Sequence, residues 1–125
     1  SEAHKTIAVL GLTFKPETDD MRDSPSLAIL PAMADKGATI RAHDPEGIDE
    51  ARNLLPSSIL YFDSIYEAIH EADAVVLMTE WNEYRGLDLE KVKDTMKGDV
   101  FVDLRNVYER ETMEKIGFSY HCVGR

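Results

Sequence analysis

Short apolar runs alternate with amphipathic stretches along almost the whole chain. The run Ala74–Met78 is apolar throughout rather than alternating, which is typical of strands covered on both faces of a sheet. Six segments are expected to form strands: Thr6–Gly11, Thr39–His43, Ile59–Tyr61, Ala74–Met78, Val100–Leu104 and Phe118–His121. Helical patterns separate them: Pro25–Lys36, Glu46–Leu54, Ile65–Glu71, Leu89–Met96 and Glu109–Lys115.

Strands joined by helical crossovers predict an α/β fold: a Rossmann-like, doubly wound, mostly parallel six-stranded sheet. The simplest strand order is 3-2-1-4-5-6, which places the switch point between the first and fourth strands. With 125 residues and a hydrophobic content of 43%, the chain can form a single domain with its own core. The first strand starts close to Ser1 and the last ends close to Arg125, so we expect a domain taken from a longer protein.

Charge and composition restrict the partners of the chain. It has 24 acidic and 14 basic residues and a net charge of −10, which disfavours binding to nucleic acid or to an anionic membrane surface. The histidines lack the spacing of a metal site. Cys122 is the only cysteine, so there is no disulfide framework, and no base that would activate it is evident nearby. We therefore expect a cytoplasmic protein with no metal site.

The loop after the first strand is where Rossmann-like folds bind phosphates. It lacks G-x-G-x-x-G, because Gly11 is its only glycine, and it carries the cations Lys15 and Arg22 instead. Lys15 suits a phosphate or a sugar hydroxyl, although a solvated lysine fits the position too. Arg22 lies just before the helix N-terminus, where it could hold a pyrophosphate. It could equally pair with its acidic neighbours Asp19, Asp20 and Asp23.

Other loops are expected at the same edge of the sheet. The loop after the fourth strand contains Trp81 and Tyr84, for which packing over the sheet end is favoured over contact with a base or ribose. Arg105 directly follows the fifth strand and can reach the same crevice as Lys15. Asp44 ends the second strand, where dinucleotide-binding domains place a ribose-binding acid. Without the glycine signature, a helix-capping role fits Asp44 better.

A set of motifs runs through nearly the whole chain in a fixed order: Gly11-Leu12-Thr13-Phe14-Lys15, Thr18-Asp19-Asp20-x-Arg22-x-Ser24-Pro25, His43-Asp44-Pro45, Ala72-Asp73-Ala74, Thr79-Glu80-Trp81 and Asp103-Leu104-Arg105-Asn106. In these motifs the chain resembles the C-terminal, nucleotide-sugar-binding domain of the UDP-glucose/GDP-mannose dehydrogenase family. The segment 79–85 and the tail 120–125 are most similar to the bacterial members that oxidise UDP-glucose.

The resemblance implies a two-step oxidation of UDP-glucose to UDP-glucuronate, with NAD as the cofactor. It implies an N-terminal NAD-binding domain and a central dimerisation segment in the same protein, so the full-length protein is expected to be a homo-oligomer. At the matching positions, Phe14, Lys15 and Arg105 would contact the UDP-sugar, and Arg22 would reach the NAD. The catalytic cysteine of the family lies outside this chain, and Cys122 matches no catalytic motif.

Two alternatives stay open at this point. Many α/β sheets of this size are nucleotide-binding or regulatory modules without catalysis of their own. Within the family, a GDP-mannose or UDP-N-acetylhexosamine dehydrogenase also fits, because sugar discrimination depends partly on residues outside this chain.

Overall fold

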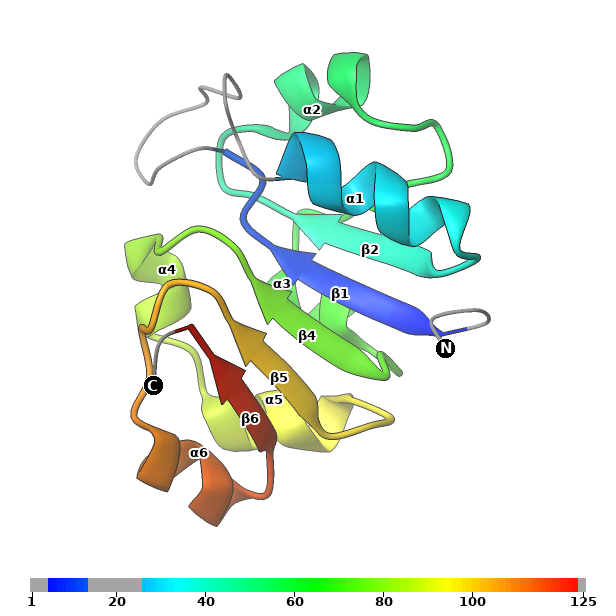
Figure 1. Cartoon of the computed structure of the whole chain (residues 1–125). Helices are drawn as coiled ribbons and strands as arrows, with labels where there is room; N and C mark the ends of the chain where they lie inside the picture. Colours follow the sequence, from blue (N-terminus) through cyan, green and yellow to red (C-terminus); the bar gives the residue numbers. More distant parts are fainter. Residues whose placement is uncertain (1–4, 14–25, 124–125) are drawn as a thin grey trace.

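The computed structural model describes residues 5–13 and 26–123, which form one sheet with helices on both faces (Figure 1). The strands are β1 (Thr6–Leu10), β2 (Thr39–His43), β3 (Leu60–Tyr61), β4 (Ala74–Leu77), β5 (Val100–Asp103) and β6 (Ser119–Cys122). The helices are α1 (Ser26–Asp35), α2 (Ile48–Leu54), α3 (Ile65–Ile69), α4 (Asn82–Arg85), α5 (Leu89–Thr95) and α6 (Arg110–Ile116).

The six strands are ordered β3-β2-β1-β4-β5-β6, and every pairing is parallel. This confirms the doubly wound fold and the strand order predicted from the sequence. The register aligns the last residues of five strands with one another: Leu10, His43, Leu77, Asp103 and Cys122. The loops that follow these strands therefore leave from one edge of the sheet, with the switch point between β1 and β4.

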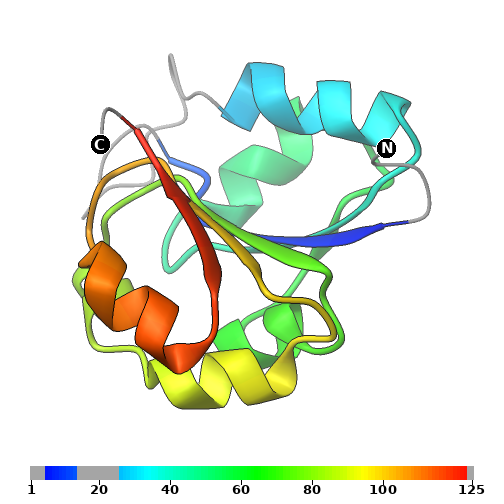
Figure 2. The same ribbon diagram turned by 60° about the horizontal axis from the view of Figure 1, so that its bottom comes forward.

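The central strands of the sheet are buried on both faces. Helices α1 and α2 cover one face, and α3, α5 and α6 cover the other (Figure 2). Because successive side chains of a strand point to opposite faces, Ile7 and Val9 join one hydrophobic cluster while Ala8 and Leu10 join the other. Two-sided burial explains why the central strands are apolar at consecutive positions rather than at alternate ones.

Within residues 5–13 and 26–123, the bounds of the expected elements agree with the structure to within two residues, and one helix is present that the pattern does not predict. This is α4, which lies in the segment after β4 where the sequence predicts a loop. A helix of 4 residues is too short to show a helical period in the sequence. Tyr84 is completely buried in it, and its hydroxyl donates a hydrogen bond to the carbonyl oxygen of His43 at 3.1 Å. Tertiary packing therefore stabilises this turn.

Candidate functional site

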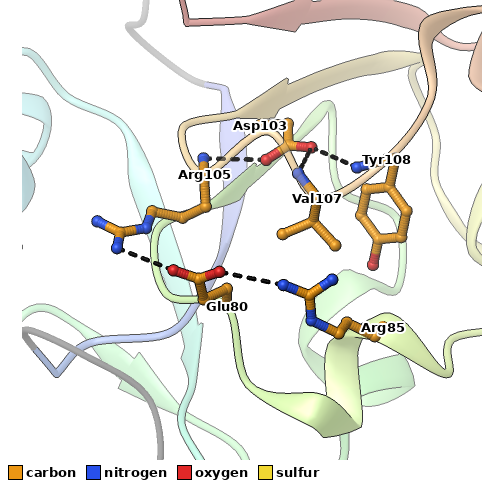
Figure 3. A network of polar contacts seen from close by, with 6 residues as sticks. All are labelled: Glu80, Arg85, Asp103, Arg105, Val107 and Tyr108. Carbon is orange, nitrogen blue, oxygen red and sulfur yellow. Dashed lines mark hydrogen bonds and ion pairs between the residues drawn. The ribbon is translucent and has the colours of Figure 1, made fainter.

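Three charged side chains lie together at the edge of the sheet where β4 and β5 end (Figure 3). Glu80 follows β4, Arg85 is the last residue of α4, and Arg105 follows β5. Oε1 of Glu80 lies 3.0 Å from Nη2 of Arg105, and Oε2 of Glu80 lies 3.1 Å from Nη2 of Arg85. One carboxylate thus joins two guanidinium groups, and the cluster keeps an excess of positive charge in contact with solvent.

The backbone of the loop that carries Arg105 is held by the fully buried carboxylate of Asp103 (Figure 3). Oδ1 accepts a hydrogen bond from the N–H of Arg105 at 3.0 Å. Oδ2 accepts from the N–H groups of Val107 and Tyr108 at 2.8 and 3.0 Å, and from the hydroxyl of Tyr120 at 2.6 Å. Since these donors come from the loop and from β6, the position of Arg105 depends on contacts across the end of the sheet.

Asn106 gives this loop its sharp turn. Its φ of 56° lies in the left-handed region, which asparagine tolerates better than most residues other than glycine. Its Nδ2 donates to the carbonyl oxygen of Val123 at 2.8 Å, so the turn is also tied to the residue that follows β6. Arg105 is therefore an exposed cation, and the next residue, Asn106, permits the sharp turn of the loop.

Asp44 organises the neighbouring part of the edge in the same way. Its Oδ2 accepts from the N–H groups of Leu12 and Thr13 at 2.7 and 3.2 Å, and its Oδ1 accepts from those of Glu46 and Gly47 at 2.9 and 2.6 Å. The N-cap residue of α2 is Gly47 rather than Asp44, so the helix-capping interpretation of Asp44 is wrong. The carboxylate instead ties the loop after β1 to the loop after β2.

The start of the β1 loop does not fit a dinucleotide site of the G-x-G-x-x-G kind. Gly11 has a φ of 95°, and a Cβ placed on it would lie 2.5 Å from Cβ of Thr79. Thr79 is buried, and its hydroxyl donates to the carbonyl oxygen of Thr13 at 2.7 Å. The space beside the glycine is therefore filled by protein, and both oxygens of Asp44 are engaged by backbone N–H groups rather than open to a ribose.

A buried pair, His43 and Tyr84, lies beneath the edge. Nδ1 of His43 is 2.9 Å from the hydroxyl oxygen of Tyr84, and the rings meet edge to face. Burial lowers the pKa of His43, although Glu83, whose Oε2 is 3.9 Å from Nε2, acts in the opposite direction. Burial, followed by the charge of Asp44, raises the pKa of Tyr84 well above its usual value. The pair is thus neutral near pH 7.

Trp81 and Tyr84 pack in the core below the charged cluster, which confirms the packing interpretation. Only 4% of Trp81 is exposed, and the hydroxyl of Tyr108 donates to the carbonyl oxygen of Tyr84. Burial also raises the pKa of Tyr108. These aromatic side chains anchor α4, which presents Arg85 to Glu80.

Cys122 is the last residue of β6. Cys122 is partly buried, and its Sγ accepts a hydrogen bond from Nη2 of Arg110 at 3.3 Å. Within residues 5–13 and 26–123, no cluster of three or more His, Cys, Asp or Glu side chains is arranged to hold a metal ion. In the same part of the chain, no helix combines the length and the apolar character that crossing a bilayer requires.

Comparison with known proteins decides the family. The sequence model of the UDP binding domain of the UDP-glucose/GDP-mannose dehydrogenase family matches residues 8–110, from β1 to the first residue of α6. The chain belongs to this family.

Named relatives in the UDP-glucose/GDP-mannose dehydrogenase family are similar to the chain over almost its whole length. It is 53% identical over 119 residues to the UDP-glucose 6-dehydrogenase of Rhizobium meliloti (strain 1021), and 42% identical over 121 residues to that of Rickettsia conorii. These alignments cover 95% and 96% of the chain but only 27% and 28% of the relatives. The chain therefore spans little more than a quarter of their length.

Solved structures of dehydrogenases give the same result for the fold. An NDP-N-acetyl-D-galactosaminuronic acid dehydrogenase from Methanosarcina mazei Go1 superimposes with a TM-score of 0.86, at 28% identity, over 99% of the chain and 25% of that protein. A UDP-glucose dehydrogenase from Pyrobaculum islandicum gives a TM-score of 0.75, at 28% identity, over 95% of the chain and 25% of that protein.

The structure places one of the predicted site residues. Arg105 lies at the carboxyl edge of the sheet, as expected. Phe14, Lys15 and Arg22 lie outside the described residues, so the convergence of Lys15 with Arg105 stays a prediction. Sequence reasoning gave Glu80 no function. The available signal was its place in Thr79-Glu80-Trp81, directly after a buried strand that neighbours the strand before Arg105.

Proposed function

We propose that the chain is the UDP-sugar-binding domain of a longer, NAD-dependent UDP-glucose 6-dehydrogenase that oxidises UDP-glucose to UDP-glucuronate. The observation that carries the proposal is the guanidinium group of Arg105, held in solvent contact at the carboxyl edge of the sheet one strand away from the switch point. Family membership and the 53% identity to a UDP-glucose 6-dehydrogenase support the choice of UDP-glucose.

A UDP-sugar carries a diphosphate, and this requires a local cation on a chain whose net charge is −10. The planar guanidinium group of an arginine can donate two parallel hydrogen bonds to a phosphate group. Lys15 follows β1 and Arg105 follows β5, and β4 lies between these strands. In this proposal Phe14, Lys15 and Arg105 contact the UDP-sugar from the two sides of β4.

NAD supplies the hydride acceptor when it is bound. The filled space beside Gly11 and the engaged carboxylate of Asp44 argue against an NAD site of the usual Rossmann kind in this domain. We therefore assign NAD mainly to the rest of the longer protein, with Arg22 reaching toward it from this chain. The nucleophile also belongs to that remainder, so no residue of this chain is assigned a catalytic role.

The proposal includes partners and location. The partners within the same protein are an N-terminal NAD-binding domain and a central dimerisation domain, which make the full-length enzyme a homo-oligomer. We place the enzyme in the cytoplasm, where the single cysteine of this chain and its lack of a disulfide framework are ordinary. Nucleic acid and membranes are not among the partners, since the acidic surface repels both.

The test is the activity of the full-length dehydrogenase against a panel of nucleotide sugars, together with the variants Lys15→Ala and Arg105→Ala. Loss of a charge-assisted hydrogen bond costs about 1.5–3 kcal/mol, so each variant should lower kcat/KM for UDP-glucose by roughly 10- to 150-fold. Unchanged kinetics in both variants would remove the substrate-site assignment. A preference for a UDP-N-acetylhexosamine would keep the site and change the sugar, and a preference for GDP-mannose would change the base as well.

The 125-residue chain alone should produce no NADH from UDP-glucose and NAD, because covalent catalysis needs a nucleophile that lies elsewhere. Turnover by the isolated chain that is abolished by Cys122→Ser would contradict the assignment of catalysis to the missing part.

A further inference from the structure

Arg105 is held by one hydrogen bond from its backbone and one from its side chain. Only the backbone contact is explained by the folding of its loop. Its backbone N–H is bound by Asp103, which also binds the rest of the loop. Its guanidinium group is bound by Glu80, which lies 25 residues before Arg105 in the sequence. Glu80 belongs to the loop after β4, whereas Arg105 belongs to the loop after β5. This second contact is not needed to close either loop.

We propose that Glu80 is a positioning residue for UDP-sugar binding: its carboxylate orients the guanidinium group of Arg105 toward the diphosphate. The inference rests on the proposed function, because it assumes that Arg105 contacts the substrate.

The contact leaves Arg105 able to bind an anion. Glu80 engages Nη2 alone, and the described residues provide no other hydrogen bond to this guanidinium group. Arginine has five N–H donors, so Nε and Nη1 stay available for phosphate oxygens. The side chain of Arg105 is 34% exposed, which leaves it accessible. A single contact of this kind restricts the rotamers of the long Arg105 side chain before substrate binds. Less conformational entropy is then lost on binding, which favours affinity.

Arg85 holds Glu80 from the other side. Its Nη2 lies 3.1 Å from Oε2 of Glu80, while Oε1 faces Arg105. Two cations against one carboxylate leave the cluster positive, so Glu80 does not cancel the attraction of the site for an anion. Arg85 in turn comes from α4, whose position depends on the buried side chain of Tyr84. The charged cluster is thus connected to the core.

The experiment measures UDP-glucose binding by calorimetry without NAD, and KM and kcat with NAD, in the full-length enzyme. Glu80→Ala should weaken binding and raise KM by about fivefold, which corresponds to ~1 kcal/mol, with kcat changed less than about twofold. Arg85→Ala should have a smaller effect in the same direction. Glu80→Gln, which keeps an oxygen acceptor for Arg105, should lie between Glu80→Ala and the unaltered enzyme, and it also serves if Glu80→Ala folds poorly.

A double-mutant cycle separates positioning from a general effect. Once Arg105→Ala is present, adding Glu80→Ala should change the affinity by less than about twofold. The matched control is Glu50→Ala, which removes an exposed carboxylate from α2 and should leave UDP-glucose binding unchanged.

The outcomes are distinguishable. Suppose that Arg105→Ala weakens UDP-glucose binding, while Glu80→Ala has no effect or an effect that adds to that of Arg105→Ala. This result overturns the inference and leaves the proposed function intact. Tighter binding in Glu80→Ala also overturns it, since Glu80 would then compete with the substrate. No effect of Arg105→Ala would overturn the inference and remove Arg105 from the substrate site. The proposed substrate site falls with it only if Lys15→Ala also leaves the kinetics unchanged.

Discussion

Asp103 is the last residue of β5, and its buried carboxylate accepts the backbone N–H of Arg105 two residues later, at 3.0 Å. The same carboxylate reaches Tyr120 of β6, so it joins the loop that carries the exposed cation to the neighbouring strand. Asp44, one residue beyond β2, likewise joins two loops, those after β1 and β2. Buried aspartates at strand ends therefore shape the edge of the sheet through hydrogen bonds to the loops.

Asp103→Asn should destabilise the chain by about 1.5–3 kcal/mol. Asparagine has one acceptor oxygen, so its NH2 group must face donors that now bind Oδ1 or Oδ2. At least one backbone N–H of the loop then loses its partner. Urea denaturation of the 125-residue chain measures the change. Asp94→Asn, at an exposed position on α5, is the control and should stay within about 0.5 kcal/mol. Equal small losses in the two variants would contradict the assigned role of Asp103.

Gly11→Ala should destabilise the chain by about 2–5 kcal/mol. The new side chain would meet a left-handed backbone, which costs about 1–2 kcal/mol. It would also overlap Thr79, whose Cβ lies 2.5 Å from the added carbon, and such overpacking costs about 1–3 kcal/mol. Gly86→Ala is the control, because the nearest atom there is 3.9 Å away. Thermal and urea denaturation measure both variants. An equal loss of stability in Gly11→Ala and Gly86→Ala would show that crowding by Thr79 does not destabilise Gly11→Ala.

His43 should make the chain less stable in mild acid. Its pKa is lowered by burial below the 6.5 of an unfolded chain, so the unfolded state takes up a proton first as the pH falls. The stabilising contribution is complete above pH 6.5 and is lost as the pH falls through the lower pKa of the folded state. Measurement of the free energy of unfolding from pH 8 to pH 5 should show this decline.

The matched variant for this pH dependence is His43→Gln, which cannot take up a proton in that range. The two proteins differ in the slope of the free energy of unfolding against pH, and this difference isolates His43 from the other titrating groups. Parallel pH profiles would show that His43 has the same pKa in the folded and unfolded states, contrary to its burial.

Arg22→Ala in the full-length enzyme should raise KM for NAD by about tenfold, corresponding to ~1.4 kcal/mol, and change KM for UDP-glucose much less. A planar guanidinium group suits a pyrophosphate, and the sequence neighbours Asp19, Asp20 and Asp23 would partly neutralise it, so a moderate effect is expected. Initial rates at varied NAD and fixed, saturating UDP-glucose measure the effect. Loss of stability without a selective NAD defect would make Arg22 a structural partner of these aspartates.

The sequence predicts the fold well because the relevant signals are local. Consecutive apolar residues such as those of β4 indicate a strand buried on both faces, and helical crossovers between strands limit the sheet to a doubly wound order. It also places Arg105 correctly, since a cation directly after a buried strand must lie at the carboxyl edge. It fails at α4, whose single turn depends on burial of Tyr84.

The partners of each polar group are decided only in three dimensions. Asp44 looks like a helix cap in the sequence because it stands two residues before the expected helix, yet its carboxylate binds N–H groups of Leu12 and Thr13, over thirty residues earlier. Glu80 has no assignable role until parallel pairing of β4 with β5 brings it next to Arg105. Local propensity and periodicity reside in consecutive residues, whereas a hydrogen bond between loops exists only after the sheet has set their positions.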